Sequence, residues 1–169
     1  YHDFCQALVK ASKGVTGEIC AWLICDHPTL RRYGLGHVKP FPVPIAHQLK
    51  NGYLKRGRTL AELAAACGID AAELERTVAE YNIHARQGED PQFGKGSKAY
   101  NRYLGDPTVT PNPCIAPVQT GPFYAVQLVI GDLGSFAGLK TDAQARVLGE
   151  DGRPVPGLYA AGNDMASIM

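Results

Sequence analysis

The sequence predicts an α+β fold, and three observations support this prediction. A nearly continuous apolar run, "EICAWLICD" at residues 18–26, has the composition of a core strand. Two capped amphipathic helices follow within residues 59–88, and residues 122–161 contain short strand patterns separated by Pro and Gly. We therefore expect helices that pack on a small sheet.

The first 50 residues predict short elements. Residues 2–12 carry three apolar side chains at helical spacing, which predicts a short helix before the apolar strand. After that strand, "HPTLRRYGLG" allows one helical turn before Gly34 and Gly36 stop it. Three prolines exclude a helix or a central strand from "KPFPVPIAHQ", so this segment is expected to be an extended connector.

The helical pair has the clearest local signals. Thr59 and Glu62 form a capping box, and Asp70 and Glu73 repeat the pattern in the next helix. Glycines at positions 68 and 88 end the two helices, and the apolar stripe of the second consists of Leu74, Val78, Tyr81 and Ala85. A strand is expected before the pair, at residues 53–55. Because acidic side chains outnumber basic ones on the second helix, packing on a sheet is favoured over DNA binding.

Residues 88–121 contain so many prolines and glycines that a long loop is expected, and such loops are often functional or wrap a neighbouring domain. A hairpin turn is expected at residues 150–152, among short strands that include "GLKTD". The segment "VPGLYAAGNDMASIM" predicts a buried strand at 158–161, a Gly-Asn turn and the beginning of a helix.

Composition excludes several classes of function. With 17 basic and 16 acidic residues the net charge is +1, which gives no electrostatic basis for binding nucleic acid. No run of about 18 apolar residues could span a bilayer, so we expect no integral membrane segment. Five cysteines, an odd number without a C-x-x-C pair, predict a reduced, cytoplasmic protein. The histidines are scattered, so no metal site is expected.

The chain contains no G-x-G-x-x-G, no Walker-type loop and no nucleophile elbow. By its motifs alone it is therefore not a self-sufficient nucleotide enzyme.

A set of segments nevertheless indicates a family. In chain order they are "GRTLAELAAACGID", "YNIHARQGEDPQFGKG", "YLGDPTVTPNPCIAPV", "GPFYAV" and "LVIGDLGSFAGLKTDAQARVL". With them the whole chain resembles the FAD-dependent 3-ketosteroid Δ1-dehydrogenase and fumarate reductase flavoprotein family. The resemblance implies an oxidoreductase with FAD as cofactor, which dehydrogenates a carbon–carbon bond next to the ketone of a steroid or a similar substrate.

The resemblance also implies that the chain is a piece of a longer protein. Residues 1–121 would be part of a substrate-binding cap domain, with helices on a small antiparallel sheet. Residues 122–169 would supply C-terminal strands of a Rossmann-type FAD-binding domain. The family's pyrophosphate-binding G-x-G-x-x-G would lie upstream and its ketone-polarising Tyr-Pro-Gly-x-Gly downstream. The isolated chain is therefore expected to be inactive.

Site residues follow from the same resemblance. "YHDF" looks like the site of the family's catalytic base, which makes Tyr1 the candidate; the alternative is a terminal tyrosine without a catalytic role. The candidate cofactor-binding residues are Gly138, Leu139, Ala161, Gly162 and Asn163, and Tyr124 and Phe136 are candidates for substrate contact. Gly162 also has a physical reason, because backbone can approach a ligand closely where no Cβ intervenes. For Tyr124 a role in the core is the alternative.

Two other functions stay open. A fumarate or succinate-type reductase would have a histidine where this chain has Gly134, which disfavours a dicarboxylate substrate. Phe136 replaces the lysine usual in the steroid branch, and this departure leaves the exact substrate open. The second of these other functions is that of a non-catalytic α+β binding module, whose bare strand edges would be covered by self-association.

Overall fold

The structure is a computed structural model that describes residues 2–12, 19–131 and 138–166. The chain divides into two compact units, residues 1–129 and residues 130–169. Helices and a small antiparallel sheet form the first unit and a second small sheet forms the other, so the predicted α+β class is confirmed. The boundary expected after residue 121 concerns domains of a longer protein and stays a prediction.

The predicted N-terminal helix is present as α1, His2–Ala11. It ends at Ser12, whose backbone N–H and hydroxyl both donate to the carbonyl of Leu8, at 3.0 and 2.8 Å. Lys10 lies in the last turn, where a cation is favourable for the helix dipole. Phe4 and Val9 are about half exposed, so this helix presents apolar surface.

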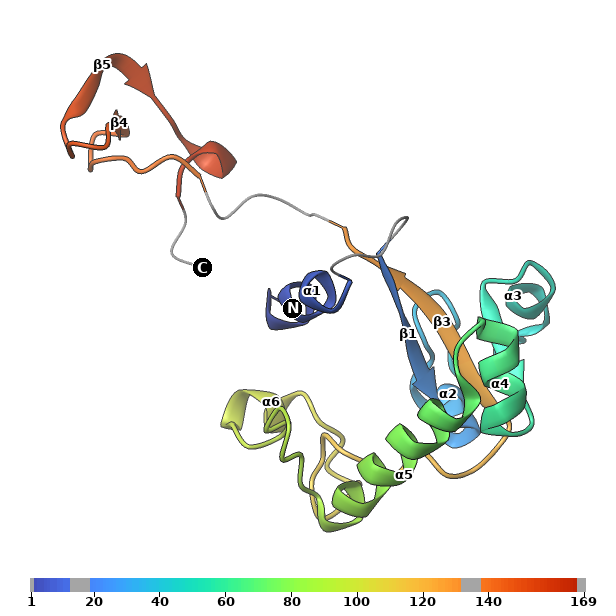
Figure 1. Ribbon diagram of the computed structural model, residues 1–169. Helices are drawn as coiled ribbons and strands as arrows, with labels where there is room; N and C mark the ends of the chain where they lie inside the picture. Colours follow the sequence, from blue (N-terminus) through green and yellow to red (C-terminus); the bar gives the residue numbers. More distant parts are fainter. Residues whose placement is uncertain (1, 13–18, 132–137, 167–169) are drawn as a thin grey trace. The chain divides into compact units, whose positions relative to one another are not determined.

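A three-stranded antiparallel sheet organises the first unit (Figure 1). Strand β3, Phe123–Val129, lies between β1, Cys20–Cys25, and β2, Leu54–Gly57. The strand predicted from "EICAWLICD" is thus confirmed, and β3 is one of the short strands expected within residues 122–161. The two strands pair with each other from Cys20↔Val129 to Cys25↔Tyr124. The strand expected at residues 53–55 is β2, which begins one residue later and extends to residue 57.

Two helices pack on one face of this sheet, and the N-cap half of each predicted capping box is present. They are α4, Leu60–Cys67, and α5, Ala71–Gln87. The Thr59 hydroxyl accepts the N–H of Glu62 at 3.1 Å, and the Asp70 carboxylate accepts the N–H of Glu73 at 2.7 Å. The return bonds differ from the prediction, because Glu62 accepts the N–H of Arg58 and Glu73 pairs with Arg76. The glycines after both helices adopt the left-handed conformation, at φ 68° and 72°.

The stripe expected on α5 is largely confirmed. Leu74, Val78 and Ala85 are buried. Tyr81 is 36% exposed, and the neighbouring Asn82 is buried instead. Leu74 and Val78 form a small core with Ala64 of α4, against which Ile24 of β1 and Val118 pack.

The opposite face of the sheet is covered by α2, His27–Tyr33, and α3, Ala46–Lys50. A larger core joins Leu30 of α2 to β1, β2 and β3, and Leu49 of α3 packs against it. The N-terminal turn of α2 is capped by the Asp26 carboxylate, which accepts the N–H of Thr29 at 3.2 Å. The prediction of an extended connector through residue 48 was wrong in its last part, because the prolines end at position 44 and α3 begins at Ala46.

Residues 88–122 form the expected long loop, interrupted only by the five-residue helix α6, Ala99–Tyr103. Two buried asparagines fix this loop. The Asn82 side-chain amide donates to the carbonyl of Val118 at 2.8 Å, and its oxygen accepts the N–H of Val118 at 2.7 Å. The Asn112 side chain donates to the carbonyls of Gly88 and Lys95, at 2.9 and 3.3 Å. These amides replace the hydrogen bonds that a buried loop backbone otherwise lacks.

The second unit contains a hairpin of β4, Arg146–Leu148, and β5, Pro154–Tyr159, around the predicted turn. "GLKTD" forms isolated bridges instead of the predicted strand. The prediction of a buried strand at 158–161 was wrong, because all six residues of β5 are exposed and Ala160 alone of the expected strand is buried. Among the described residues β5 pairs only with β4. The expected helix start is a single 3₁₀ turn, Gly162–Asp164.

Candidate functional site

The five residues expected near the cofactor lie in two segments of the second unit, which the structure places side by side. They are Gly138, Leu139, Ala161, Gly162 and Asn163. Leu139 forms a parallel bridge with Met165. Its N–H donates to the carbonyl of Asp164 at 2.9 Å, and its carbonyl accepts the N–H of Ala166 at 2.9 Å. The backbone itself therefore joins the two segments.

Gly138 is required by this junction. A Cβ at this position would lie 2.3 Å from the carbonyl carbon of Met165 and 2.6 Å from the carbonyl oxygen of Asp164. Both of these atoms belong to the backbone and cannot move aside as a flexible side chain could. The close approach of the two segments thus depends on the missing side chain of Gly138.

Gly162 has a different geometry. Its φ is 61°, and a Cβ here would meet no described atom within 4 Å, so the space in front of its Cα is open. Ala161 and Asn163 on either side are exposed, and Leu139 across the bridge is 50% exposed. The two segments thus offer backbone and exposed side chains to solvent, and at Gly162 no side chain stands between the backbone and an approaching ligand.

An ion pair stiffens the turn that leads from this junction into β4. Arg146 Nη2 lies 2.6 Å from Asp142 Oδ2, and Asp142 Oδ1 accepts the N–H groups of Gln144 and Arg146, each at 3.0 Å. The hydrogen bond from the Arg146 side chain lowers the pKa of Asp142 below its usual value. The turn also holds Ala145 at a positive φ of 60°. These contacts fix the chain that follows Leu139.

The other predicted site residues are in the first unit or outside the described residues. Tyr1 and Phe136 lie outside the described residues. Tyr124 is buried in the core of β3, and its hydroxyl lies 3.1 Å from Nδ1 of His27. This position gives Tyr124 a packing role in the described structure; its predicted substrate contact stays a prediction.

Two cavities of the first unit were not predicted from the sequence. The larger has a volume of about 840 Å³ and lies between β1, α5 and the loop at 89–95, with Trp22, Ile24 and Val78 in its wall. The smaller, of about 500 Å³, lies between β1, α2 and residues 101–116. Both have Ile24 and Tyr81 in their walls, so they adjoin. The continuous apolar run of β1 was the available signal, because it leaves apolar side chains on both faces of the strand, but the partners across the cavities are distant in sequence.

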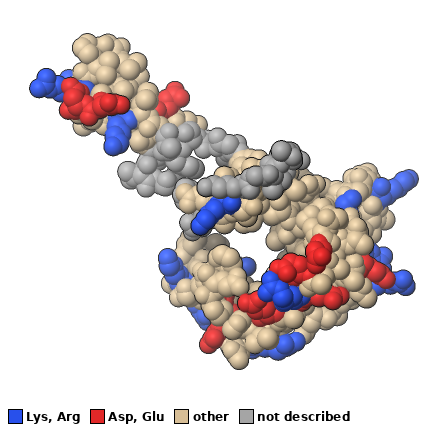
Figure 2. All heavy atoms as spheres, in the orientation of Figure 1, with Lys and Arg blue, Asp and Glu red and all other residues tan. Residues whose placement is uncertain are grey.

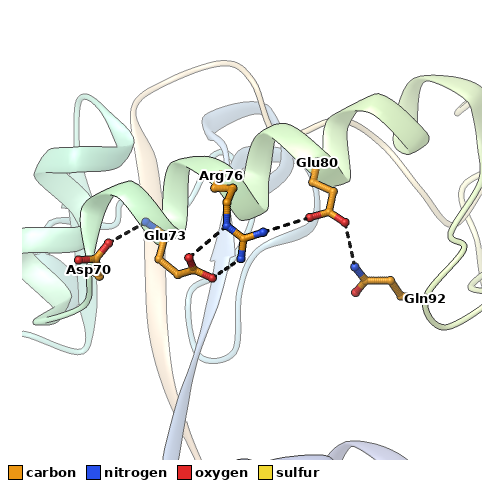
Figure 3. A network of polar contacts seen from close by, with 5 residues as sticks. All are labelled: Asp70, Glu73, Arg76, Glu80 and Gln92. Carbon is orange, nitrogen blue, oxygen red and sulfur yellow. Dashed lines mark hydrogen bonds and ion pairs between the residues drawn. The ribbon is translucent and has the colours of Figure 1, made fainter.

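The rim of the larger cavity carries a network of compensated charges on α5 (Figure 3). The guanidinium of Arg76 lies 2.5 Å from Glu73 and 3.6 Å from Glu80, and Gln92 donates to Glu80 at 3.4 Å. The hydrogen bond from Arg76 lowers the pKa of Glu73. Because Arg76 is shared by two carboxylates, its own charge is compensated within α5.

A second polar cluster ties the long loop to α2. Asp106 accepts hydrogen bonds from the Tyr33 hydroxyl at 2.5 Å and from the Thr108 hydroxyl at 2.7 Å, and Arg32 lies 2.8 Å away. Chiefly through the Tyr33 and Thr108 hydrogen bonds, the pKa of Asp106 falls to about 2. The hydrogen bond between the Tyr33 hydroxyl and Asp106 raises the pKa of Tyr33.

This cluster predicts a specific acid sensitivity. The carboxylate of Asp106 has a lower pKa in the folded chain than the value of about 3.9 in an unfolded one. Its contribution to stability is therefore complete above about pH 4 and is lost as the pH falls toward about 2. In Asp106→Asn the free energy of unfolding, measured with urea, should therefore decrease less between about pH 4 and about pH 2 than in the unaltered protein. Glu75→Gln, at an exposed carboxylate of α5, is the control and should leave the slope unchanged.

Lys and Arg are interspersed with Asp and Glu on the face seen in Figure 2, without a large basic patch. In the described ranges no cluster of three or more His, Cys, Asp or Glu could hold a metal ion. No helix of residues 2–12, 19–131 or 138–166 is long and apolar enough to cross a membrane.

Comparison with known proteins gives consistent matches along the whole chain. The family described as FAD binding domain matches residues 1–169. The chain is 46% identical over 169 residues to 4-oxocyclohex-2-ene-1-carboxylate 5-dehydrogenase of Sinomonas cyclohexanicum, and covers 28% of that protein. It is 40% identical over 152 residues to 3-oxosteroid 1-dehydrogenase of Mycolicibacterium smegmatis, with 90% of this chain and 27% of that protein covered.

A solved structure agrees with these matches. The 3-ketosteroid Δ1-dehydrogenase of Sterolibacterium denitrificans, in complex with 1,4-androstadiene-3,17-dione, superposes with a TM-score of 0.85 at 39% identity. The match covers 98% of this chain and 30% of that one. The chain thus spans less than a third of the length of each of these three relatives.

Proposed function

The chain belongs to the FAD binding domain family, and from this membership we propose that it is part of a longer flavoprotein that dehydrogenates a carbon–carbon bond beside a ring ketone. The resemblance to 3-ketosteroid Δ1-dehydrogenases expected from the sequence is confirmed. The observation that carries the proposal is the continuous match of all 169 residues to a dehydrogenase of a cyclic ketone.

FAD is the cofactor of this family, and the second unit fits it. The open backbone at Gly162 and the exposed side chains of Ala161, Asn163 and Leu139 would border the flavin. Gly138 would hold their two segments together. FAD bound there supplies the acceptor for the two electrons that leave the substrate's carbon–carbon bond.

Tyr1 is our candidate for the base. Its phenolate would take the proton from the carbon next to the ketone, while a hydride leaves the neighbouring carbon and a double bond forms between them. A tyrosine needs neighbours that lower its pKa from about 10 to act in this way. In the proposed arrangement residues 1–121 belong to the substrate-binding cap and residues 122–169 to the FAD-binding domain.

For the substrate, we propose a six-membered ring ketone, either isolated or fused in a steroid. The relatives' names support both, and the predicted positions Phe136 and Tyr124 would contact its ring. The fumarate alternative is disfavoured by Gly134, which stands where a fumarate reductase would have a histidine. The five cysteines, all free thiols, support our proposal of a reducing, cytoplasmic location.

The test uses the full-length polypeptide that contains residues 1–169, purified with FAD. Without oxygen, a 4-oxocyclohexanecarboxylate or a 3-ketosteroid saturated at carbons 1 and 2 should bleach the visible absorbance of the flavin and yield the corresponding enone. Succinate should not. Bleaching by succinate alone would support the reductase alternative, and no bleaching by any of the three would contradict the proposal.

A further inference from the structure

The two edges of the three-stranded sheet differ in how they are protected. Exposed edge strands invite pairing with other chains, so proteins usually shorten them or give them charges, prolines or bulges. The β2 edge follows this rule, since it has four residues and carries Lys55 and Arg56. The β1 edge does not. Its six residues, "CAWLIC", contain no charge and no proline, and they pair with β3 without a register shift.

Both faces beside the β1 edge are apolar. Leu23 is 44% exposed on the face that carries the buried Cys25. On the other face Trp22 and Ile24 border the 840 Å³ cavity, opposite Leu74 and Val78 of α5. A strand added at this edge would therefore hydrogen-bond to the backbone of β1 and meet apolar side chains next to β1 on both faces, with the charged rim of the cavity farther out on the α5 side.

We propose that the β1 edge is the docking site for an extended, uncharged strand from the part of the same polypeptide outside residues 1–169. The match to the Sterolibacterium enzyme covers 98% of this chain but 30% of that one, so most of a homologous chain is available to supply the strand. A second copy fits less well. The edge lies beside cavities walled by α5 and by residues 89–116, which a single strand can enter more easily than another complete sheet.

Amide hydrogen exchange tests this proposal without any need for bound flavin. In an edge strand alternate N–H groups point away from the partner, so they exchange quickly. In the full-length polypeptide we expect slow exchange at all six residues, 20–25, at every protein concentration. Fast exchange at alternate residues would overturn the proposal. Protection that increases with protein concentration would overturn it in favour of a second copy.

Leu23→Lys provides an independent test. In the full-length polypeptide it should lower the melting temperature by about 5 °C and accelerate exchange at residues 20–25, because a charge is forced into a covered apolar contact. The matched control is Ile83→Lys, at an exposed apolar residue of α5. It should leave the exchange of β1 unchanged. Unchanged exchange of β1 in Leu23→Lys as well would contradict the proposed docking.

Discussion

Tyr1→Phe is expected to lower kcat of the full-length polypeptide by about 10²–10⁴-fold, the usual contribution of a general base. Phenylalanine keeps the ring but cannot take a proton from the carbon beside the ketone. Because a tyrosinate base needs its proton removed first, the rate of the unaltered protein should rise with pH, and this rise should be absent in the variant. Steady-state turnover of a ring ketone across a pH series measures both effects.

Two controls accompany this prediction. The variant should retain its full content of FAD, which its visible absorbance reports, and should bind a product analogue as before. The control variant is Tyr33→Phe, because the Tyr33 hydroxyl donates a hydrogen bond to Asp106 and has no proposed catalytic role. This variant should keep turnover within a factor of about ten. A Tyr1→Phe protein with nearly unchanged kcat would show that another residue is the base.

Gly138→Ala is expected to destabilise the second unit by about 1–3 kcal/mol, the cost of an added methyl group in a tightly packed site. The new Cβ would overlap the backbone of Met165, so Leu139 could not keep its bridge. In the full-length polypeptide the flavin should dissociate more readily. Thermal unfolding and the ratio of flavin to protein absorbance measure the two consequences.

The control for this change is Gly131→Ala, because a Cβ at Gly131 meets no described atom within 4 Å. It should unfold at the same temperature as the unaltered chain and retain its flavin. If Gly138→Ala behaves in the same way, the close approach of the two segments does not require glycine.

Local chemistry made much of the helical part predictable. Thr59 and Asp70 cap backbone N–H groups three residues later, so the start of each helix depends on neighbours in sequence. The glycines at 68 and 88 end these helices for an equally local reason, a positive φ. The burial of Asn82 also had a local signal, since it follows Val78 by four residues on the same helical face.

Features that depend on distant contacts were harder to predict. The pairing of β1 with β3 joins residues about a hundred positions apart, and no local pattern specifies it. The apolar residues at 158–161 predicted a buried strand. In the hairpin, however, β5 pairs only with β4 among the described residues, so its side chains stay exposed. For the site, the glycines identified by family resemblance proved to lie together, whereas the cavities beside Trp22 arise from segments that sequence spacing cannot relate.

The asparagine contacts of the long loop have a consequence for how the chain can change in evolution. Asn82 and Asn112 hold the loop at its base, and the Asn82 contact alone spans 36 positions. Once the ends are fixed, the entropic cost of closing the loop rises slowly with loop length, by about 0.6 kcal/mol for each doubling. As far as closure entropy is concerned, residues added near the exposed side chains of Tyr100 and Tyr103, before the Asp106 cluster, would therefore cost little. We expect homologous chains to vary most in length there, and to keep a side-chain amide at each of the two anchor positions.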